Sequence, residues 1–381
     1  LEFRRVLFRS KDLVKKFHAE GIEVLMEIFF PEGTEERLIF DCLEHWVRDY
    51  HVDGFYLMGD DSMNRFLARD PMFVGTKLLS TWFDTDNIYE RKKTPAFRNL
   101  AEHNDGFLVD ARRFLKGDED QLPAFTWRVR KNPAKCAVIN YITHHDGFTL
   151  MDLVSYEERH NEANGEGGQD GPAYNFSWNC GVEGPSRKKK IQELRLQQMK
   201  NAFLLLLFSQ GTPMILAGDE FGNSQRGNNN PYCQDNETSW LEWNGLKKQT
   251  ELFEFVKAAI AFRKTHPLLH QAKELQGTSG SVLGYPDVSC HGQQAWYGNF
   301  ETTSRHFGMM YCGEEGEYLY VAYNLHWKEQ SFALPKLPEG LSWQLVFDTE
   351  DGASPEKEIK WIDQKSFEAP PRSILVLEGR K

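Results

Sequence analysis

Amide, carboxylate and aromatic side chains lie in short polar segments of this chain, where they could bind a ligand rich in hydroxyl groups. Amides and carboxylates donate to or accept from hydroxyl groups, and flat rings cover the apolar faces of such a ligand. The polar members are Asn228, Asn229, Asn230, Gln234, Asp235 and Asn236, and the aromatic members are Trp82, Phe83, Trp178, Tyr232 and Trp240. The same residue types also serve in turns and in packing, so the composition alone leaves both roles open.

Acidic residues also follow apolar runs that have the length of buried strands. His145 and Asp146 end one such run, and Asp60 and Asp61 lie just beyond Met58 at the end of another. A histidine-aspartate pair at a strand end can contact a ligand or cap the strand, and acids beyond a strand can be solvated turn residues. The residue types therefore allow carboxylate chemistry at strand ends without requiring it.

The charge balance favours a neutral ligand. Lysine and arginine total 45 against 56 aspartates and glutamates, so the 381-residue chain carries a formal net charge of -11 at pH 7. This gives no electrostatic reason to expect a nucleic acid or an anionic membrane as partner. The longest apolar run, 202–208, is much shorter than the roughly 20 residues that cross a bilayer, and no secretory signal is visible. We therefore expect a soluble protein of the cytoplasm, or of the plastid if the source is a plant.

The cysteines give no sign of a metal centre. They are far apart and form no Cys-x-x-Cys pair with histidines at metal-ligand spacing; they are Cys42, Cys136, Cys180, Cys233, Cys290 and Cys312. We interpret them as reduced thiols and predict neither a metal site nor a cofactor.

From Lys11 onward the hydrophobic pattern alternates between helical and strand periods. Buried strands are predicted at 22–30, 52–58, 76–83, 99–103, 137–146 and 212–219, and helices at 13–18, 37–50, 107–115, 189–209 and 252–264. This alternation predicts an α/β fold, a (β/α)8-type (TIM) barrel in which reacting groups collect at the carboxyl ends of the strands. The sequence accounts for six of the eight strands, so the first strands of the barrel are expected to lie outside it.

The hydrophobic pattern changes after the predicted helix at 252–264. Short strands at 319–322, 331–334, 343–347 and 373–377 are separated by glycine, proline and charged turns, which predicts an antiparallel β-sandwich domain. We therefore divide the chain into a leader at 1–10, a partial barrel at 11–270 and an all-β domain at 271–381. The leader is basic and apolar and fits no element, so we interpret it as non-native. An incomplete barrel would expose strand edges, so a longer protein is expected.

Several segments together resemble one family. They read YITHHDGFTL at 141–150, DLVSY at 152–156, SWNCG at 177–181, SQGTPM at 209–214, AGDEFG at 217–222 and GNNNPYCQDN at 227–236. In their order and spacing they are similar to the isoamylase and glycogen-debranching group of the α-amylase-type glycoside hydrolases. The resemblance covers roughly residues 11–381 and implies a barrel followed by a β domain.

The resemblance also implies a chemistry. The family removes α-1,6 branches from glycogen or starch with retention, which requires two carboxyl groups about 5 Å apart, one a nucleophile and the other a general acid and base. A third carboxylate favours the transition state, and Asp146 after His145 matches it. The segment Val52–Asp53–Gly54–Phe55 aligns Met58 with the nucleophile, and Lys77–Leu78–Leu79 aligns Thr81 with the general acid.

Neither replacement can perform the family's reaction. A methionine thioether carries no charge, and a threonine hydroxyl is far too weak an acid near neutral pH. The strand that ends near Pro31 also differs, because Phe30-Pro31-Glu32 lacks the family's asparagine-histidine pair, which removes a reason to predict a metal there. We hypothesise a degenerate, non-hydrolytic member of the family that acts by binding α-glucan or an active debranching homologue.

Two alternatives remain open. The chain could be an active α-1,6-glucosidase that uses relocated carboxylates at Asp60, Asp61 or Glu102, or a structural partner without affinity for glucan. By the resemblance, the residues expected to contact the glucan are His145, Trp82, Asn228, Asn229, Gln234, Asp235 and Asn236.

Overall fold

The computed structural model describes residues 2–89, 93–278, 284–314, 316–351 and 362–381. The chain divides into two compact units, and each is described by itself. Unit 1 comprises residues 1–105 and 132–139, and unit 2 comprises residues 106–131 and 140–381.

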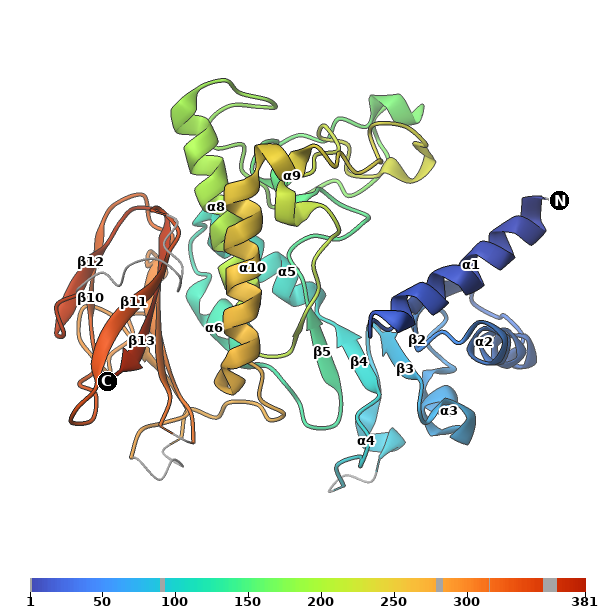
Figure 1. Ribbon diagram of the computed structural model, residues 1–381, viewed down its shortest axis with the longest axis horizontal. Coiled ribbons are helices and arrows are strands. Elements are labelled where there is room, and N and C mark those ends of the chain that lie inside the picture. The colour runs from blue at the N-terminus through green and yellow to red at the C-terminus, as the bar shows by residue number, and fades with distance from the viewer. Residues whose placement is uncertain (1, 90–92, 279–283, 315, 352–361) are drawn as a thin grey trace. The chain divides into compact units, whose positions relative to one another are not determined.

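Unit 1 is built on parallel strands with helices beside them (Figure 1). Its strands are β1 Leu25–Phe30, β2 Gly54–Gly59, β3 Lys77–Ser80, β4 Leu100–His103 and β5 Ala137–Asn140, whose last residue belongs to unit 2. Its helices are α1 Glu2–Ala19, α2 Glu36–Tyr50, α3 Asn64–Arg69, η1 Pro71–Phe73 and α4 Thr85–Ile88. Each strand from β1 to β4 pairs in parallel with the next one along the chain.

Burial of one helix stripe against the strands explains why this part of the sequence folds as it does. Ile39 and Leu43 of α2 are buried together with Phe55 of β2 and Leu78 of β3, in a single hydrophobic cluster. Gly54 begins β2 because the neighbouring strand lies too close for a side chain: a Cβ there would be 2.3 Å from the carbonyl oxygen of Lys77.

Unit 2 begins with helices and loops. Its helices are α5 Asp105–Lys116, whose first residue belongs to unit 1, α6 Leu122–Arg130, α7 Leu150–Leu153, η2 Glu162–Asn164, α8 Lys189–Leu207, η3 Asp219–Phe221, η4 Pro231–Cys233, α9 Gly245–Lys248, α10 Thr250–Thr265 and η5 Pro267–Leu269. The two-residue strand β6 Thr212–Pro213 follows β5 in the order of the six-stranded sheet. Long loops precede α8 and α9, which leaves polar residues at the carboxyl ends of β5 and β6.

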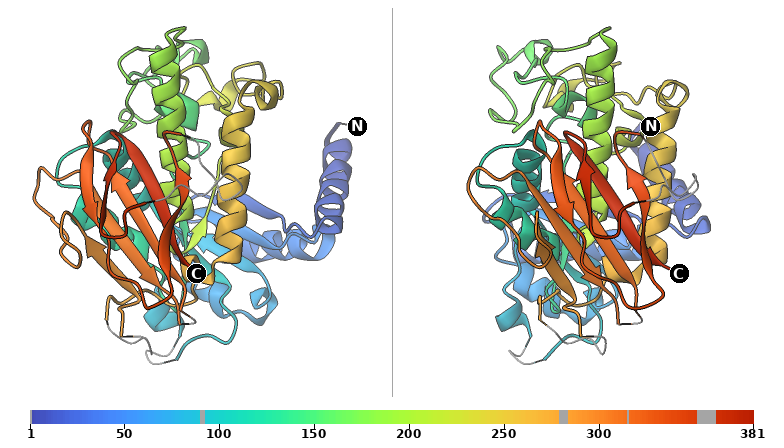
Figure 2. Two further views of the ribbon diagram at one scale, coloured as in Figure 1. Left: turned by 60° about the vertical axis from the view of Figure 1, so that its left-hand side comes forward. Right: turned by 90° about the vertical axis from the view of Figure 1, so that its left-hand side faces the viewer.

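The C-terminal part of unit 2 is an antiparallel sheet, shown from two sides in Figure 2. Its strands β7 Val288–His291, β8 His306–Cys312, β9 Tyr318–Asn324, β11 Ser342–Asp348 and β13 Ser373–Arg380 lie in the order β11-β13-β9-β8-β7, and β10 Gln330–Ala333 pairs with β12 Ser366–Ala369. Alternation along β8 explains the layers, because Phe307, Met309 and Tyr311 pack into the cluster that includes α8 and α10, whereas Met310 and Cys312 pack into a second cluster.

This architecture confirms the predicted fold, a partial (β/α) barrel followed by an antiparallel β domain. The predicted boundary between residues 270 and 271 lies inside unit 2, where the sheet and the last helices share a core, and it stays a prediction. The leader predicted at 1–10 lies largely within α1, which begins at Glu2, and its origin also stays a prediction.

Three predicted strands are too long, and the first of them, predicted at 76–83, forms a strand only from Lys77 to Ser80. The run at 137–146 forms a strand only as far as Asn140, whose side chain donates to the carbonyl of Gln210 at 2.7 Å, while Thr143 beyond it donates to Asp219. The run at 212–219 keeps two strand residues and then forms η3, since the glycine at 218 adopts a φ of 99°. Sequence patterning also missed α6 and the strands β7, β8 and β12.

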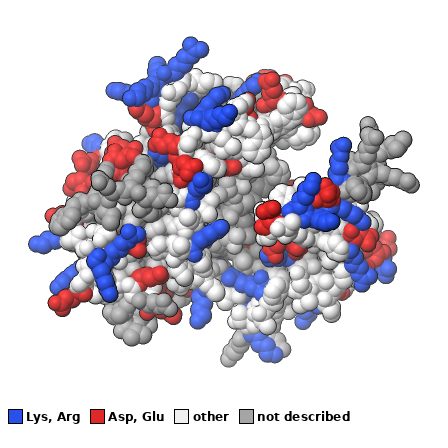
Figure 3. All heavy atoms as spheres, in the orientation of Figure 1, with Lys and Arg blue, Asp and Glu red and all other residues white. Residues whose placement is uncertain are grey.

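Acidic and basic side chains are interspersed on the face seen in Figure 3. Among the helices that the structure describes, none combines the length and the hydrophobicity that crossing a membrane requires.

Candidate functional site

Met58 and Thr81 lie at matching levels on neighbouring strands of unit 1. In the parallel register of β2 and β3, Tyr56 is opposite Leu79, so two residues further along Met58 of β2 comes level with Thr81, which follows β3. Neighbouring strands are about 4.8 Å apart, which is close to the roughly 5 Å that separates the two carboxyl groups of a retaining glycosidase. The register thus puts a thioether and a hydroxyl on neighbouring strands, at the two positions that the resemblance assigns to the catalytic pair.

Glu102 is occupied by the segment that follows β3. One of its carboxylate oxygens accepts the backbone N–H of Phe83 at 3.0 Å, and the residue lies opposite Ser80 in the register of β3 and β4. This contact holds the turn that carries Trp82, whose side chain is 57% exposed. The geometry therefore gives Glu102 a structural role and leaves the ring of Trp82 exposed, while glucan contact by Trp82 stays a prediction.

Substitution of Glu102 tests this role. Glu102→Ala should lower the free energy of unfolding by about 1 kcal/mol, because the Phe83 N–H loses its acceptor. Glu102→Gln keeps an acceptor oxygen and should lose less than half as much in the same urea titration. Equal losses in the two variants would show that the hydrogen bond does not stabilise this turn.

Asp60 is a turn residue in the structure. Its carboxylate accepts the N–H of Ser62 at 2.9 Å, and its own N–H donates to the carbonyl of Phe30 at 2.9 Å. Hydrogen bonds from the Ser62 side chain and backbone hold the pKa of Asp60 below its ordinary value. A carboxylate held in this way is directed toward its own turn and does not replace the side chain at position 58.

The residues after β5 bring His145 and Asp146 to the surface of unit 2. Tyr141, Ile142 and Thr143 are buried, whereas His145 and Asp146 are exposed. Asp146 is hydrogen-bonded to Nδ1 of His144, and this bond is the main cause that lowers the pKa of Asp146. The Asp146 carboxylate therefore stays ionised over the neutral range. The centroid of the His145 ring lies 4.1 Å from that of the His144 ring.

Arg112 of α5 fixes the backbone that leads to this pair. Its Nε donates to the carbonyl oxygen of Ile142 at 2.6 Å, and a terminal nitrogen donates to that of Asn175 at 2.9 Å. Burial lowers the pKa of Arg112 to about 10, while the negative charge of Asp219 acts in the opposite direction. The guanidinium therefore remains charged at neutral pH and joins three segments of unit 2.

Two buried aspartates also hold the loops and helices near His145 and Asp146 in place. Asp219 accepts hydrogen bonds from the Thr143 hydroxyl and from the N–H of Leu150, and burial raises its pKa to about 7. Asp152 accepts from the Ser224 hydroxyl and the Gln225 N–H, and burial raises its pKa to about 6. These contacts tie α7 and the loop before it to η3 and to the segment that follows η3. Sequence reasoning assigned no role to Arg112, Asp152 or Asp219, although an arginine inside a predicted apolar helix is a signal of buried pairing.

The asparagine loop is held mainly by its own amides. Asn228 and Asn229 are buried, and Asn229 donates to the carbonyl of Pro172 at 2.8 Å and to Oδ1 of Asn175 at 2.9 Å. Asn228 exchanges hydrogen bonds with Asn164. In this structure the two side chains shape the loop instead of facing solvent, so glucan contact by them stays a prediction without geometric support.

The remaining predicted contacts lie further along the same loop. Gln234 donates to the carbonyl of Ala163 and to Asn164, both at 2.9 Å, while Asn236 donates to Gln234 at 2.7 Å. Asp235 and Asn236 are exposed, and a carboxylate oxygen of Asp235 accepts from the indole nitrogen of Trp240 at 3.0 Å. Unit 2 therefore presents His145, Asp146, Asp235 and Asn236 at its surface, while unit 1 presents Trp82.

Comparison with known proteins identifies the group to which these features belong. Residues 289–357 match the family described as "Isoamylase 1-3, C-terminal". Isoamylase 3, chloroplastic, of Oryza sativa subsp. japonica is 35% identical over 337 residues, which cover 82% of this chain and 42% of the relative. A glycogen operon protein GlgX homolog of Mycobacterium tuberculosis is 33% identical over 385 residues, covering 90% of this chain and 52% of the relative. The chain belongs to the isoamylase and debranching group of the α-amylase-type glycoside hydrolases.

Solved structures agree with this isoamylase-group assignment at the level of the fold. The catalytic module of the pneumococcal glycogen-degrading virulence factor SpuA has a TM-score of 0.71 at 16% identity and covers 97% of this chain and 63% of its own. Pullulanase from Bacillus acidopullulyticus has a TM-score of 0.65 at 16% identity and covers 97% of this chain and 48% of its own. The isoamylase-group chain spans about half the length of the curated relatives it matches.

Proposed function

We propose that this chain binds α-glucan of the glycogen or starch type without hydrolysing it. The observation that carries the proposal is that Met58 and Thr81, level with each other at the ends of neighbouring strands, have no carboxyl group. The relatives support the ligand class, since they include an isoamylase, glycogen operon proteins and a glycogen debranching enzyme.

The loss of hydrolysis follows from the two side chains. Attack by the thioether of Met58 would leave a sulfonium instead of an ester that water cleaves in the ordinary way, and Thr81 cannot protonate a leaving oxygen near pH 7. Asp60 lies two residues beyond Met58, about 6.6 Å further along an extended strand, whereas displacements of about 1 Å already matter for catalysis. Glu102 is bonded to the Phe83 N–H. Neither residue restores the pair.

Binding does not require those carboxylates. Asp146 stays ionised beside His144, and its oxygens can accept hydrogen bonds from sugar hydroxyl groups, while the exposed ring of Trp82 can cover an apolar sugar face. We infer that such a protein acts by holding glucan, with an active debranching homologue as its candidate partner, in the cytoplasm or the plastid.

Affinity electrophoresis of the 381-residue chain in gels that contain glycogen tests the binding. We expect glycogen to retard the chain, and His145→Ala together with Asp146→Asn to weaken the retardation about tenfold, as the loss of contacts worth about 1.4 kcal/mol requires. Glu254→Gln, an exposed change on α10, is the control and should migrate like the wild type. Migration unaffected by glycogen would contradict the proposal and favour a structural partner without glucan affinity.

A further inference from the structure

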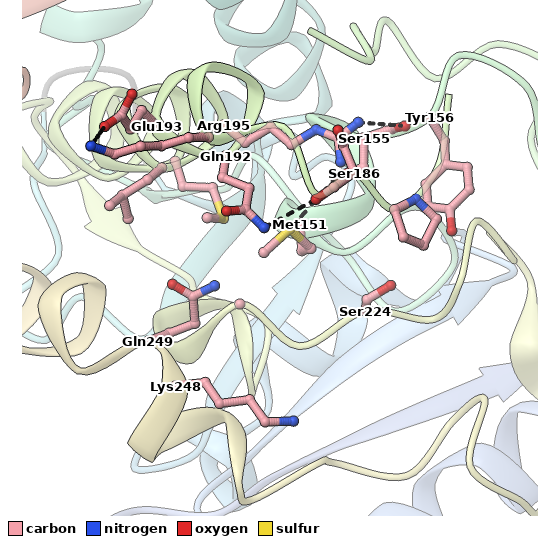
Figure 4. Close-up of a pocket in the computed structure, with 15 residues that line it drawn as sticks. Met151, Ser155, Tyr156, Ser186, Gln192, Glu193, Arg195, Ser224, Lys248 and Gln249 are labelled. Atoms are coloured by element: carbon pink, nitrogen blue, oxygen red, sulfur yellow. Dashed lines mark hydrogen bonds and ion pairs between the residues drawn. The ribbon is translucent and has the colours of Figure 1, made fainter. Parts of the chain in front are cut away.

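Two neighbouring cavities of unit 2 have lining residues in common, and the first of them lies beside α8. The first has a volume of about 670 Å³ and is lined by α7, by the beginning of α8 and by the segment around Gln249, whose side chains Figure 4 shows. The second has a volume of about 430 Å³ and extends toward Trp240. Gly222, Ser224, Lys248 and Gln249 line both. We call the two cavities together the α8 groove.

The α8 groove has an apolar wall with neutral hydrogen-bonding groups around it. Met151, Leu196 and Met199 supply the apolar surface. Gln192 donates its amide to the carbonyl of Ser186 at 3.0 Å and keeps its own oxygen as an acceptor. Among the described residues, the side-chain amide of Gln249 has no hydrogen-bond partner. Apolar walls with a few amide and hydroxyl groups suit a ligand that carries both CH faces and hydroxyl groups.

The charges that line the groove are largely engaged with the protein. Lys189 and Glu193 both line the first cavity and form an ion pair at 3.4 Å. Figure 4 labels Glu193 and marks its ion pair with a dashed line. Arg195 is buried, and one terminal nitrogen donates to the carbonyl oxygens of Asn179 and Val182. Lys189 is thus paired with Glu193 and Arg195 with backbone oxygens, while Lys248, which lines both cavities, can donate to a hydroxyl group of a neutral ligand.

An aromatic ring lies in each of the two cavities. Tyr156 lines the first, and Trp240, with 57% of its surface exposed, lines the second. The hydrogen bond from the Trp240 indole to Asp235, at 3.0 Å, fixes the plane of the ring. A ring held open in this way can stack on the apolar face of a sugar at little entropic cost.

We propose that the α8 groove is a second binding site for a linear segment of α-glucan. The proposal rests on the proposed function and adds a site to it, because neither His145 nor Asp146 lines the groove. Two sites on one protein can bind two chains of the same branched polysaccharide. Glycogen should therefore be held more tightly than a short linear oligosaccharide by multivalency.

Isothermal titration of the 381-residue chain with maltoheptaose tests the groove by stoichiometry. We expect two bound molecules per chain for the wild type and one for the double variant Trp240→Ala, Gln249→Ala. The same double variant should lose about tenfold in glycogen affinity. Its matched control is Trp127→Ala with Gln197→Ala, because Trp127 is also an exposed tryptophan and neither residue lines the groove.

The outcomes separate the groove from the proposed function. A wild-type stoichiometry of one, or a stoichiometry of two that persists in the Trp240→Ala, Gln249→Ala variant, overturns the groove and leaves glucan binding intact. No heat of binding and no retardation by glycogen overturns both. Binding of inorganic phosphate that depends on Lys248, with no effect of the groove variants on maltoheptaose, would show an anion site and overturn the groove proposal.

Discussion

Replacing Arg112 with methionine should lower the free energy of unfolding by about 3 kcal/mol, as expected when a buried charged donor is removed from its acceptors. Methionine preserves much of the side-chain volume but leaves the carbonyl oxygens of Ile142 and Asn175 without the donor that now satisfies them. It also removes the positive charge with which Asp219 interacts. The urea midpoint of the chain measures the loss.

The neighbouring Arg113 provides the matched control. It lies on the same helix, is partly exposed and faces Asp118 at 3.5 Å, so Arg113→Met should change the free energy of unfolding by less than about 1 kcal/mol. Because Arg112 holds the backbone that precedes His145 and Asp146, Arg112→Met should also weaken retardation by glycogen. Equal urea midpoints for the two variants would contradict the role assigned to Arg112.

Replacing Asp219 with asparagine should remove a fall in stability that the wild type shows as the pH rises. The pKa of Asp219 is raised to about 7 in the folded chain, whereas an unfolded aspartate has a pKa of about 3.9. Between these values the folded state holds a proton that the unfolded state has released. The stabilisation is therefore complete below about pH 4 and is lost as the pH rises through about 7.

Urea titrations at several pH values measure this effect as the difference between variant and wild type. From pH 5 to pH 7 that difference should move by about 2 kcal/mol in favour of Asp219→Asn, since one pKa unit corresponds to about 1.4 kcal/mol. Asp152→Asn is the comparison. Because the pKa of Asp152 is raised to about 6, the stabilisation that its proton provides should be lost about one pH unit lower than that of Asp219. Parallel pH profiles for Asp219→Asn and the wild type would refute the assignment.

The strand β2 was predictable because burial on both faces leaves a continuous apolar run, here Phe55 to Met58. Strand ends were less predictable. Nothing in the run at 137–146 marks Asn140 as the last strand residue, and the reason lies in a tertiary contact, the hydrogen bond from the Asn140 side chain to the carbonyl of Gln210 at 2.7 Å. The strand β8 was missed because both of its faces are buried and its sequence, with histidine, glycine and two methionines, lacks β-branched residues.

Part of the candidate site was likewise predictable from the sequence, and part of it was not. The substitutions at Met58 and Thr81 are visible in the sequence, because a known pattern marks which positions need a carboxylate, and the register of β2 and β3 then shows that they lie level. The burial of Asn229 and the pairing of Glu102 with Phe83 depend on contacts between distant segments. No local pattern encodes these contacts, and they separate residues that shape the site from residues that face a ligand.

The central claim is that this chain holds α-glucan and does not cut it. Its most direct test is the release of new reducing ends from a glycogen limit dextrin, with an active isoamylase as the assay control. We predict no release above the uncatalysed rate at any concentration of the chain. Release in proportion to the added chain would contradict the account, and its abolition by Asp60→Asn, Asp61→Asn or Glu102→Gln would assign the activity to relocated carboxylates.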